Sequence, residues 1–117
     1  MIHTPKVIVY VDDNALLRET VSALLDARGH RVCLASNATQ ALHIVASIHA
    51  DTVIFEQALA GMNGLALARA LRADGFTGRL VVFSSVLTDE LREAFGLLPV
   101  DALLEKPCGM PSLADAV

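Results

Sequence analysis

Five short strand-like runs alternate with longer helical patterns along this chain, and no other feature of the sequence limits the fold as strongly. Three of the runs, "VIVYV", "TVIF" and "LVVF", are almost continuously apolar, as expected for strands that helices cover on both faces. Such strands belong to parallel sheets, because the connection between two parallel strands must cross a face of the sheet. The sequence therefore predicts an α/β protein.

The expected strands span residues 6–11, 31–35, 52–56, 79–84 and 101–105. Apolar residues at helical spacing fill the gaps between them. Asn37 and Thr88 are placed to cap the starts of two helices, and Gly29 and Gly75 to end two others. Successive right-handed β/α units of this kind predict a doubly wound three-layer sandwich.

The length of 117 residues suits a single domain over residues 1–117. A last helix should begin near Pro111, and only a short part of it precedes Val117. We therefore expect a truncated last helix. The sequence is then either an excised domain, with an output domain or a kinase core beyond Val117, or a chain that lacks its tail.

The composition argues against two roles for this chain, direct nucleic-acid binding and membrane crossing. The net charge is −4 and no basic cluster occurs, which argues against direct nucleic-acid binding. The longest apolar runs are about five residues, against the roughly twenty needed to cross a bilayer, and no signal peptide is apparent. Cys33 and Cys108 lie far apart in the sequence and show no metal-ligand spacing. We therefore expect them to be reduced thiols of a cytoplasmic protein. Apolar residues form 54% of the chain and aromatic ones 4%, so we expect an aliphatic core.

Polar residues lie at the ends of four of the expected strands. Asp12 and Asp13 follow the first strand, Glu56 and Ser84 are the last residues of the third and fourth, and Lys106 follows the fifth. Taken singly, these residues have plain roles: the acidic pair could cap a helix, the serine could stabilise a turn, and the lysine could be solvated. Together they meet at one edge of a parallel sheet, where carboxylates can hold a divalent cation and a lysine can balance anionic charge. The four histidines are scattered, and we expect them at the surface or at helix ends.

The segments "VIVYVDDNALLRE", "DTVIFEQALAGMNGLALARALR", "LVVFSS" and "DALLEKP" resemble, in order and spacing, the receiver domain of response regulators in two-component signalling. The resemblance implies a flavodoxin-like fold with strand order 2-1-3-4-5. It implies that Asp12 and Asp13 bind Mg²⁺, that Ser84 contacts a phosphoryl group, and that Lys106 is the lysine of the site. It also implies a cis peptide bond between Lys106 and Pro107.

Three positions depart from the pattern of that family. Glu56 stands where the phosphoacceptor aspartate is expected, Ala60 replaces a proline, and Leu103 replaces the aromatic switch residue of the fifth strand. The extra methylene of a glutamate moves its carboxylate by roughly 1.3–1.5 Å, and a displacement of about 1 Å can slow a positioned reaction on the order of 100-fold. We therefore expect slow or absent phosphorylation at Glu56, whose longer reach toward Lys106 and Ser84 would partly imitate a phosphoryl group.

These residues give three expected sets. The acceptor site comprises Glu56, Ser84 and Lys106; the metal set comprises Asp12, Asp13 and Glu56; and Ser84 with Leu103 occupies the switch positions. Three neighbouring acids repel one another, so Lys106, a bound Mg²⁺ or a protonated acid must balance them. The sequence leaves these three alternatives open.

The leading hypothesis is an atypical receiver domain, regulatory rather than enzymatic, that works without phosphorylation. It would bind a histidine kinase or another signalling protein, or form a homodimer, through residues 88–95, 101–105 and the last helix. The alternative is a phosphorylatable receiver that accepts a phosphoryl group from a histidine kinase with Mg²⁺. A flavodoxin-like ligand binder is a third hypothesis, disfavoured because the loop "VDDNALL" has no glycine and two acids.

Overall fold

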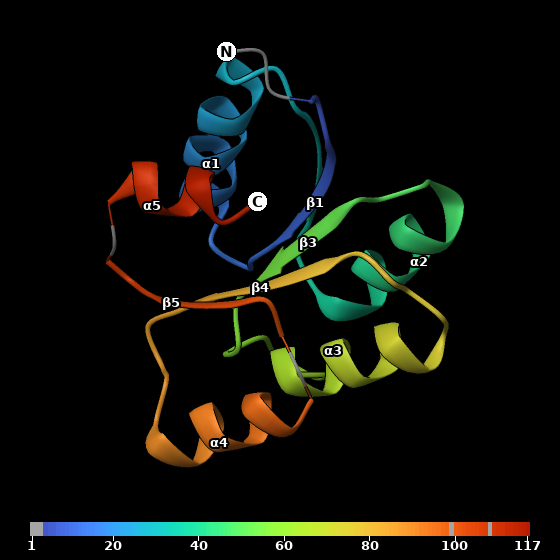
Figure 1. Ribbon diagram of the computed structural model, residues 1–117, viewed down its shortest axis with the longest axis vertical. Helices are drawn as coiled ribbons and strands as arrows, with labels where there is room; N and C mark the ends of the chain where they lie inside the picture. The colour runs from blue at the N-terminus through green and yellow to red at the C-terminus, as the bar shows by residue number, and fades with distance from the viewer. Residues whose placement is uncertain (1–3, 99, 108) are drawn as a thin grey trace.

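The computed structural model describes residues 4–98, 100–107 and 109–117. Strands and helices alternate through this part of the chain (Figure 1). The strands are β1 Val7–Val11, β2 Arg31–Ala35, β3 Thr52–Phe55, β4 Arg79–Ser84 and β5 Ala102–Glu105. The helices are α1 Ala15–Ala27, α2 Ala38–Ser47, α3 Gly64–Ala73, α4 Asp89–Leu97 and α5 Met110–Asp115. The predicted strands are confirmed to within one residue at each end.

The five strands form one sheet in the order β2-β1-β3-β4-β5, and every neighbouring pair is parallel. The α/β prediction with strand order 2-1-3-4-5 is therefore confirmed. Val11 at the end of β1 pairs with Phe55 at the end of β3, and Phe55 pairs with Val82 of β4. The carboxyl ends of the central strands consequently lie side by side.

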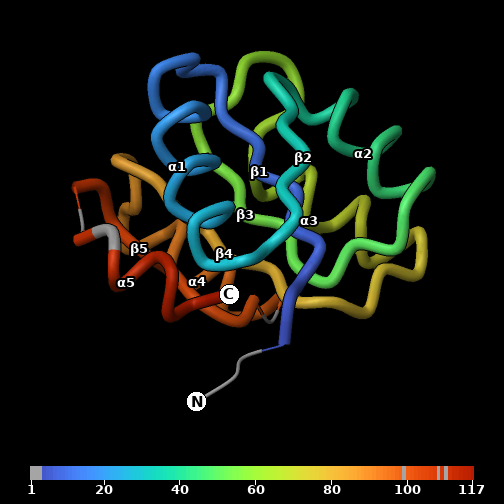
Figure 2. The backbone as a smooth tube through the Cα atoms, turned by 90° about the horizontal axis from the view of Figure 1, so that it is seen from above, coloured from blue at the N-terminus to red at the C-terminus, as the bar shows by residue number. Residues whose placement is uncertain are grey.

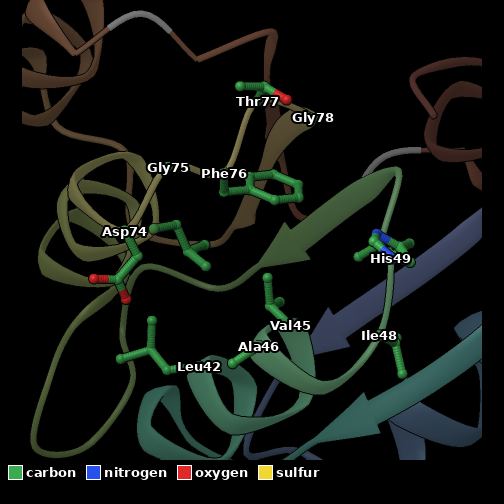
Figure 3. Close-up of a pocket in the computed structure, with 12 residues that line it drawn as sticks. Leu42, Val45, Ala46, Ile48, His49, Asp74, Gly75, Phe76, Thr77 and Gly78 are labelled. Atoms are coloured by element: carbon green, nitrogen blue, oxygen red, sulfur yellow. The ribbon is translucent and has the colours of Figure 1, made fainter.

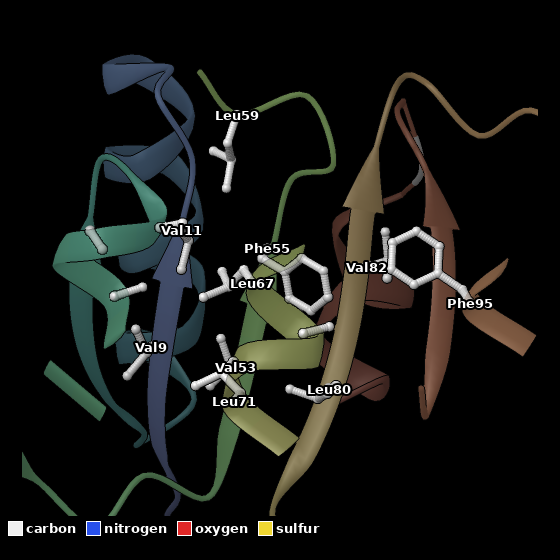
Figure 4. Packing of buried hydrophobic residues seen from close by; sticks show 14 residues of the cluster. Val9, Val11, Val53, Phe55, Leu59, Leu67, Leu71, Leu80, Val82 and Phe95 are labelled. Atoms are coloured by element: carbon white, nitrogen blue, oxygen red, sulfur yellow. The ribbon is translucent and has the colours of Figure 1, made fainter. Parts of the chain in front are cut away.

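The helices cover the sheet on both faces, with α1 and α5 on one face and α2, α3 and α4 on the other (Figures 1 and 2). One apolar cluster joins the sheet to the three-helix face, and its members include Val9, Val53, Phe55, Leu67, Leu80 and Phe95 (Figure 4). A second cluster joins the sheet to α1 and α5, and its members include Ile8, Tyr10, Val21, Leu25, Phe83 and Leu113. The three-layer prediction is confirmed.

The core is mostly aliphatic, as expected, but aromatic side chains also contribute to it. Its largest fully buried side chains include four aromatic residues: Tyr10, Phe55, Phe83 and Phe95. A low aromatic content says little about location, because an aromatic ring buries more apolar area than an aliphatic side chain and so tends to occupy the centre of a core.

The helix starts follow the capping rules. The side chains of Asn37 and Thr88 accept hydrogen bonds from the backbone N–H groups of Gln40 and Leu91, as predicted. Asn14 and Asn63 cap α1 and α3 in the same way. The predicted stops of α1 and α3 are also supported, since Gly29 and Gly75 have positive φ angles of 87° and 91°.

The three histidines that the structure describes lie at the surface or at a helix end, as expected. His43 and His49 are exposed, but His30 is only 7% exposed, and its Nδ1 accepts a hydrogen bond from the Lys6 backbone N–H at 3.1 Å. A histidine at a helix end can thus also fill a packing position. His3 lies outside the described residues. Among the described helices, none has the length and apolar character needed to cross a membrane.

Candidate functional site

The ends of β1, β3 and β5 bring two acids and a lysine together. The Lys106 ammonium lies 2.7 Å from Oδ2 of Asp12 and 3.1 Å from Oε1 of Glu56. Asp12 is 1% exposed and Glu56 is 5% exposed. One partly buried cation therefore bridges two buried carboxylates that lie far apart in the sequence.

Asp12 is held by hydrogen bonds to both of its carboxylate oxygens. Oδ1 accepts from the Asn14 backbone N–H at 3.0 Å, and Oδ2 accepts from the Tyr10 hydroxyl at 2.7 Å as well as from Lys106. The Arg18 guanidinium donates to the backbone carbonyl of Asp12 at 2.7 Å. The helix cap itself is Asn14, so the capping role considered for the acidic pair belongs to the next residue.

Glu56 is also held at both oxygens. Oε1 accepts from Lys106, while Oε2 accepts from the backbone N–H groups of Gln57 at 2.6 Å and Ala58 at 3.2 Å. The longer side chain of a glutamate allows this carboxylate to turn back onto its own loop. The loop is fixed in turn, because the side-chain oxygen of Gln57 accepts from the Leu65 backbone N–H at 2.7 Å.

Lys106 has a well-defined electrostatic environment. Burial lowers the pKa of its ammonium, but the hydrogen bonds and charges of Asp12 and Glu56 outweigh this effect, so the pKa is raised above its ordinary value. The ammonium also lies 5.2 Å from the centre of the Phe83 ring, within range of a cation–π contact. The lysine is therefore charged and supplies the positive charge that the two acids need. The peptide bond that follows it, between Lys106 and Pro107, is cis, as the resemblance implied.

Two predicted site residues do not join this group. Tyr10, Asp12, Glu56 and Lys106 form the group that we call the acid site. Asp13 is exposed, and the hydrogen bonds of the acid site are made without it. Ser84 is fully buried, but its hydroxyl oxygen accepts a hydrogen bond from the Val86 backbone N–H at 3.1 Å. Strand alternation explains this placement, because Ser84 lies on the same face of β4 as Leu80 and Val82, away from the Tyr10 side of the sheet.

The switch position Leu103 lies in β5, where it pairs with Val82 and packs against the core cluster of the three-helix face. Its partly buried side chain is purely aliphatic. It is therefore a packing residue in this arrangement, and the switch role remains a prediction. Ala60, in the loop after Glu56, is exposed.

Tyr10 is the residue of the site that the sequence motifs missed. In the run "VIVYV" it counts as one more apolar strand residue. Yet it stands two positions before Asp12, and alternate residues of a strand lie on the same face. Burial first, and then the hydrogen bond and charge of Asp12, raise the pKa of its hydroxyl above the ordinary value. The sequence signal that could have revealed this contact is the two-residue spacing of a tyrosine and an aspartate along a buried strand.

The resemblance to receiver domains implies a site for Mg²⁺, so the residues present must be compared with what that ion needs. All four carboxylate oxygens of Asp12 and Glu56 already accept hydrogen bonds from protein donors. Within the described ranges, no three Asp, Glu, His or Cys side chains are grouped so that they could hold a metal ion. As arranged, the site does not fit Mg²⁺, and the metal set of Asp12, Asp13 and Glu56 stays a prediction.

A separate cavity lies at the opposite edge of the sheet, near the starts of β3 and β4 (Figure 3). Its volume is about 470 Å³, and residues of α2, the end of α3 and the loops before these strands line it. Leu42, Val45 and Phe76 give it apolar walls, with His49 and Asp74 as its ionisable residues. No residue of the acid site lines it, so the two sites are distinct.

Comparison with solved structures supports the fold. A CheY-like receiver domain protein from Methanospirillum hungatei is 20% identical, with a TM-score of 0.91 over 96% of this chain and 90% of that one. A response regulator receiver protein from Pseudomonas putida is 26% identical, with a TM-score of 0.89 over 98% and 97% of the two chains.

Curated relatives show the same similarity in sequence. The DNA-binding response regulator MtrA of Mycobacterium tuberculosis is 36% identical over 90 residues, which cover 77% of this chain and 39% of the relative. The sensor histidine kinase AruS of Pseudomonas aeruginosa is 33% identical over 115 residues, or 94% of this chain and 11% of the relative. This chain thus spans only a part of each of these proteins. Residues 8–117 match the family profile of the response regulator receiver domain. The chain belongs to the receiver domain family of two-component signalling.

Proposed function

We propose that this domain is an atypical receiver whose output does not depend on phosphorylation of an aspartate. Glu56 occupies the acceptor position, and the domain acts as a regulatory binding module rather than as an enzyme. It passes on a signal by contact with another protein.

The hydrogen bonding of Glu56 is the observation that carries this proposal. An acceptor carboxylate must attack phosphorus with a free oxygen placed in line with the leaving group. One oxygen of Glu56 accepts from Lys106 and the other from two backbone N–H groups. Phosphorylation would have to break one of these buried arrangements before the reaction could begin.

The same arrangement supports partial imitation of an activated state. A phosphoryl group brings a charge of about −1.5 to −2, whereas Glu56 brings a single negative charge one methylene farther out than an aspartate. Lys106, which would contact a phosphoryl group, is already engaged with that charge. The proposed state is therefore constitutive, and weaker than a phosphorylated one.

The proposed docking face comprises α4, β5 and α5. Leu97 at the end of α4 is 83% exposed, and Arg92 of α4 forms an ion pair with Glu105 of β5 that is open to solvent on this face. Its proposed partner is a histidine kinase, another signalling protein or a second copy of the domain, in the cytoplasm. The relatives are longer proteins, so we also propose an output domain beyond Val117.

Intact-mass measurement after incubation with acetyl phosphate and Mg²⁺ tests the proposal. We expect no added phosphoryl mass on the wild-type domain. The matched variant Glu56→Asp restores the usual acceptor, and we expect a measurable adduct on it. A stoichiometric adduct on the wild type would overturn the proposal.

The contact between Lys106 and Glu56 also favours a second candidate function, because it puts a carboxylate and the lysine of the site within 3.1 Å. In this alternative, Glu56 accepts a phosphoryl group from a histidine kinase with Mg²⁺ after the site rearranges. Beryllofluoride, which imitates a phosphoryl group, separates the two. Saturable binding that Glu56→Gln abolishes would support the alternative, and the absence of binding would support the first proposal.

A further inference from the structure

Tyr10 is the part of the acid site that the proposed function does not use. Its ring is fully buried in the apolar cluster between the sheet and the α1–α5 face. Its hydroxyl lies 2.7 Å from Oδ2 of Asp12. A buried hydroxyl needs a partner, and here the partner is the carboxylate that the family pattern assigns to a cation.

The Tyr10 hydroxyl and the Lys106 ammonium converge on the same oxygen of Asp12, each at 2.7 Å. The other oxygen, Oδ1, accepts a hydrogen bond from the Asn14 backbone N–H. Asp12 is therefore neutralised by one full positive charge and two further donors, in a place that water scarcely reaches. Because Tyr10 and Lys106 take up both lone-pair sites of Oδ2, a divalent cation that binds this oxygen would have to displace one of them.

We propose that Tyr10, together with Lys106, takes the place of a divalent cation at Asp12, and that the Tyr10 hydroxyl keeps the affinity of this site for Mg²⁺ low. The site is then held together by protein donors alone. This inference deepens the proposed function, because a domain that needs no phosphoryl group also needs no metal to receive one.

The variant Tyr10→Phe isolates the hydroxyl, because it removes one oxygen atom and leaves the ring to fill the core. Lys106 then becomes the single donor on Oδ2, so that oxygen is free to turn toward an ion. Hydrogen bonds to charged groups are among the stronger ones in proteins. We therefore expect Tyr10→Phe to bind Mg²⁺ at least about tenfold more tightly than the wild type, which corresponds to about 1.4 kcal/mol.

Calorimetric titration of Mg²⁺ into the two proteins measures this difference. Thr20→Val is the matched control, since the Thr20 hydroxyl donates to the Leu16 carbonyl within α1, at 2.9 Å. Loss of this hydroxyl should leave the Mg²⁺ affinity unchanged. Equal affinities in the wild type and Tyr10→Phe, whether both are measurable or both undetectable, would overturn the role of Tyr10.

The wild type offers a second measurement, because the chain has a single tyrosine and no tryptophan. Its intrinsic emission therefore reports Tyr10 alone and is sensitive to the hydrogen bond with Asp12. We expect this emission to stay constant over the Mg²⁺ concentrations that saturate Tyr10→Phe, and a saturable change at lower concentrations would overturn the inference. A wild type that binds Mg²⁺ tightly but takes up no phosphoryl group would overturn this inference and leave the proposed function standing.

Discussion

At the scale of single residues, Lys106 is the cation that balances two buried acids. It is the cation that contacts both Asp12 and Glu56, and its side chain is 14% exposed. Replacing it by methionine keeps most of the volume but leaves two buried carboxylates without a counter-charge. Removing one partner of a buried ion pair costs about 3–5 kcal/mol. We expect Lys106→Met to lower the free energy of unfolding by an amount in this range, measured by urea denaturation.

The control for Lys106→Met is Arg92→Met. Arg92 pairs with Glu105 at the surface, with side-chain exposures of 40% and 60%, and such pairs contribute about 0–1 kcal/mol. Adding Asp12→Asn to Lys106→Met should recover part of the lost stability, because one of the uncompensated charges is then removed. Similar losses for the two methionine variants would contradict this account.

The alkaline stability of the domain depends on Tyr10 and Lys106. Both pKa values are raised in the folded state, from ordinary values of 10.0 and 10.5. Above pH 10 the unfolded chain loses protons that the folded domain keeps, so the free energy of unfolding falls as pH rises. Below that range the stabilisation by both groups is fully present.

We expect the urea concentration at the midpoint of unfolding to decrease as the pH rises above about 10. The decrease should be less steep in Tyr10→Phe, which lacks one of the two groups. Near-ultraviolet absorbance should show tyrosinate only together with unfolding. Ionisation of Tyr10 in the folded domain near its ordinary pKa would contradict the hydrogen bond to Asp12.

At the scale of elements, the junction between β3 and α3 positions Glu56. A Cβ atom at Gly64, the first residue of α3, would lie 2.7 Å from the Glu56 carbonyl oxygen and 2.8 Å from the Gln57 Cα. These are backbone atoms, which cannot move aside cheaply. We expect Gly64→Ala to destabilise the domain by roughly 1–3 kcal/mol and to shift the loop that holds the Glu56 carboxylate.

Gly96 provides the matched control, because it lies within α4 and nothing stands within 4 Å of a Cβ placed there. Alanine at this position should stabilise the helix by about 0.5–1 kcal/mol. Thermal unfolding of both variants tests the opposite signs. A neutral Gly64→Ala variant would show that the junction is looser than the distances indicate.

The elements were largely predictable because their signals are local. Apolar runs mark the buried strands, and a side chain such as Asn37 or Thr88 caps the helix that directly follows it. The contacts within the site were only partly predictable. The convergence of Asp12, Glu56 and Lys106 follows from parallel strands, which end at one edge of the sheet.

The remaining details of the site depend on side-chain direction, which the order of strands does not determine. Ser84 and Asp13 are adjacent to the site in sequence, but one faces the other side of the sheet and the other faces solvent. Tyr10 was missed because its apolar ring satisfies the strand pattern by itself. Its hydroxyl matters only through a partner two residues away.

At the scale of the whole molecule, the proposed docking face should mediate association regardless of phosphodonor. Leu97 is 83% exposed on α4, where a large apolar side chain suits an interface. We expect Leu97→Glu to weaken self-association, or the binding of an identified partner, by about tenfold or more. Sedimentation over a range of concentrations measures this, and acetyl phosphate should leave the result unchanged.

Leu16→Glu is the control for this experiment, since Leu16 is similarly exposed at 73% but lies on α1. Equal effects of the two variants would argue against the face formed by α4, β5 and α5. An association that appears only with acetyl phosphate would instead favour the phosphorylatable alternative.

The way the Glu56 carboxylate is bound bears on how long a signal lasts. A phosphoryl group on an aspartate is eventually hydrolysed, so the signal of an ordinary receiver has a limited lifetime. A carboxylate that belongs to the side chain, fixed by Lys106 and two backbone N–H groups, never decays. Under the proposed function, the duration of the signal is therefore governed by how fast the protein is made and degraded. The strength of the signal then depends on the concentration of the protein.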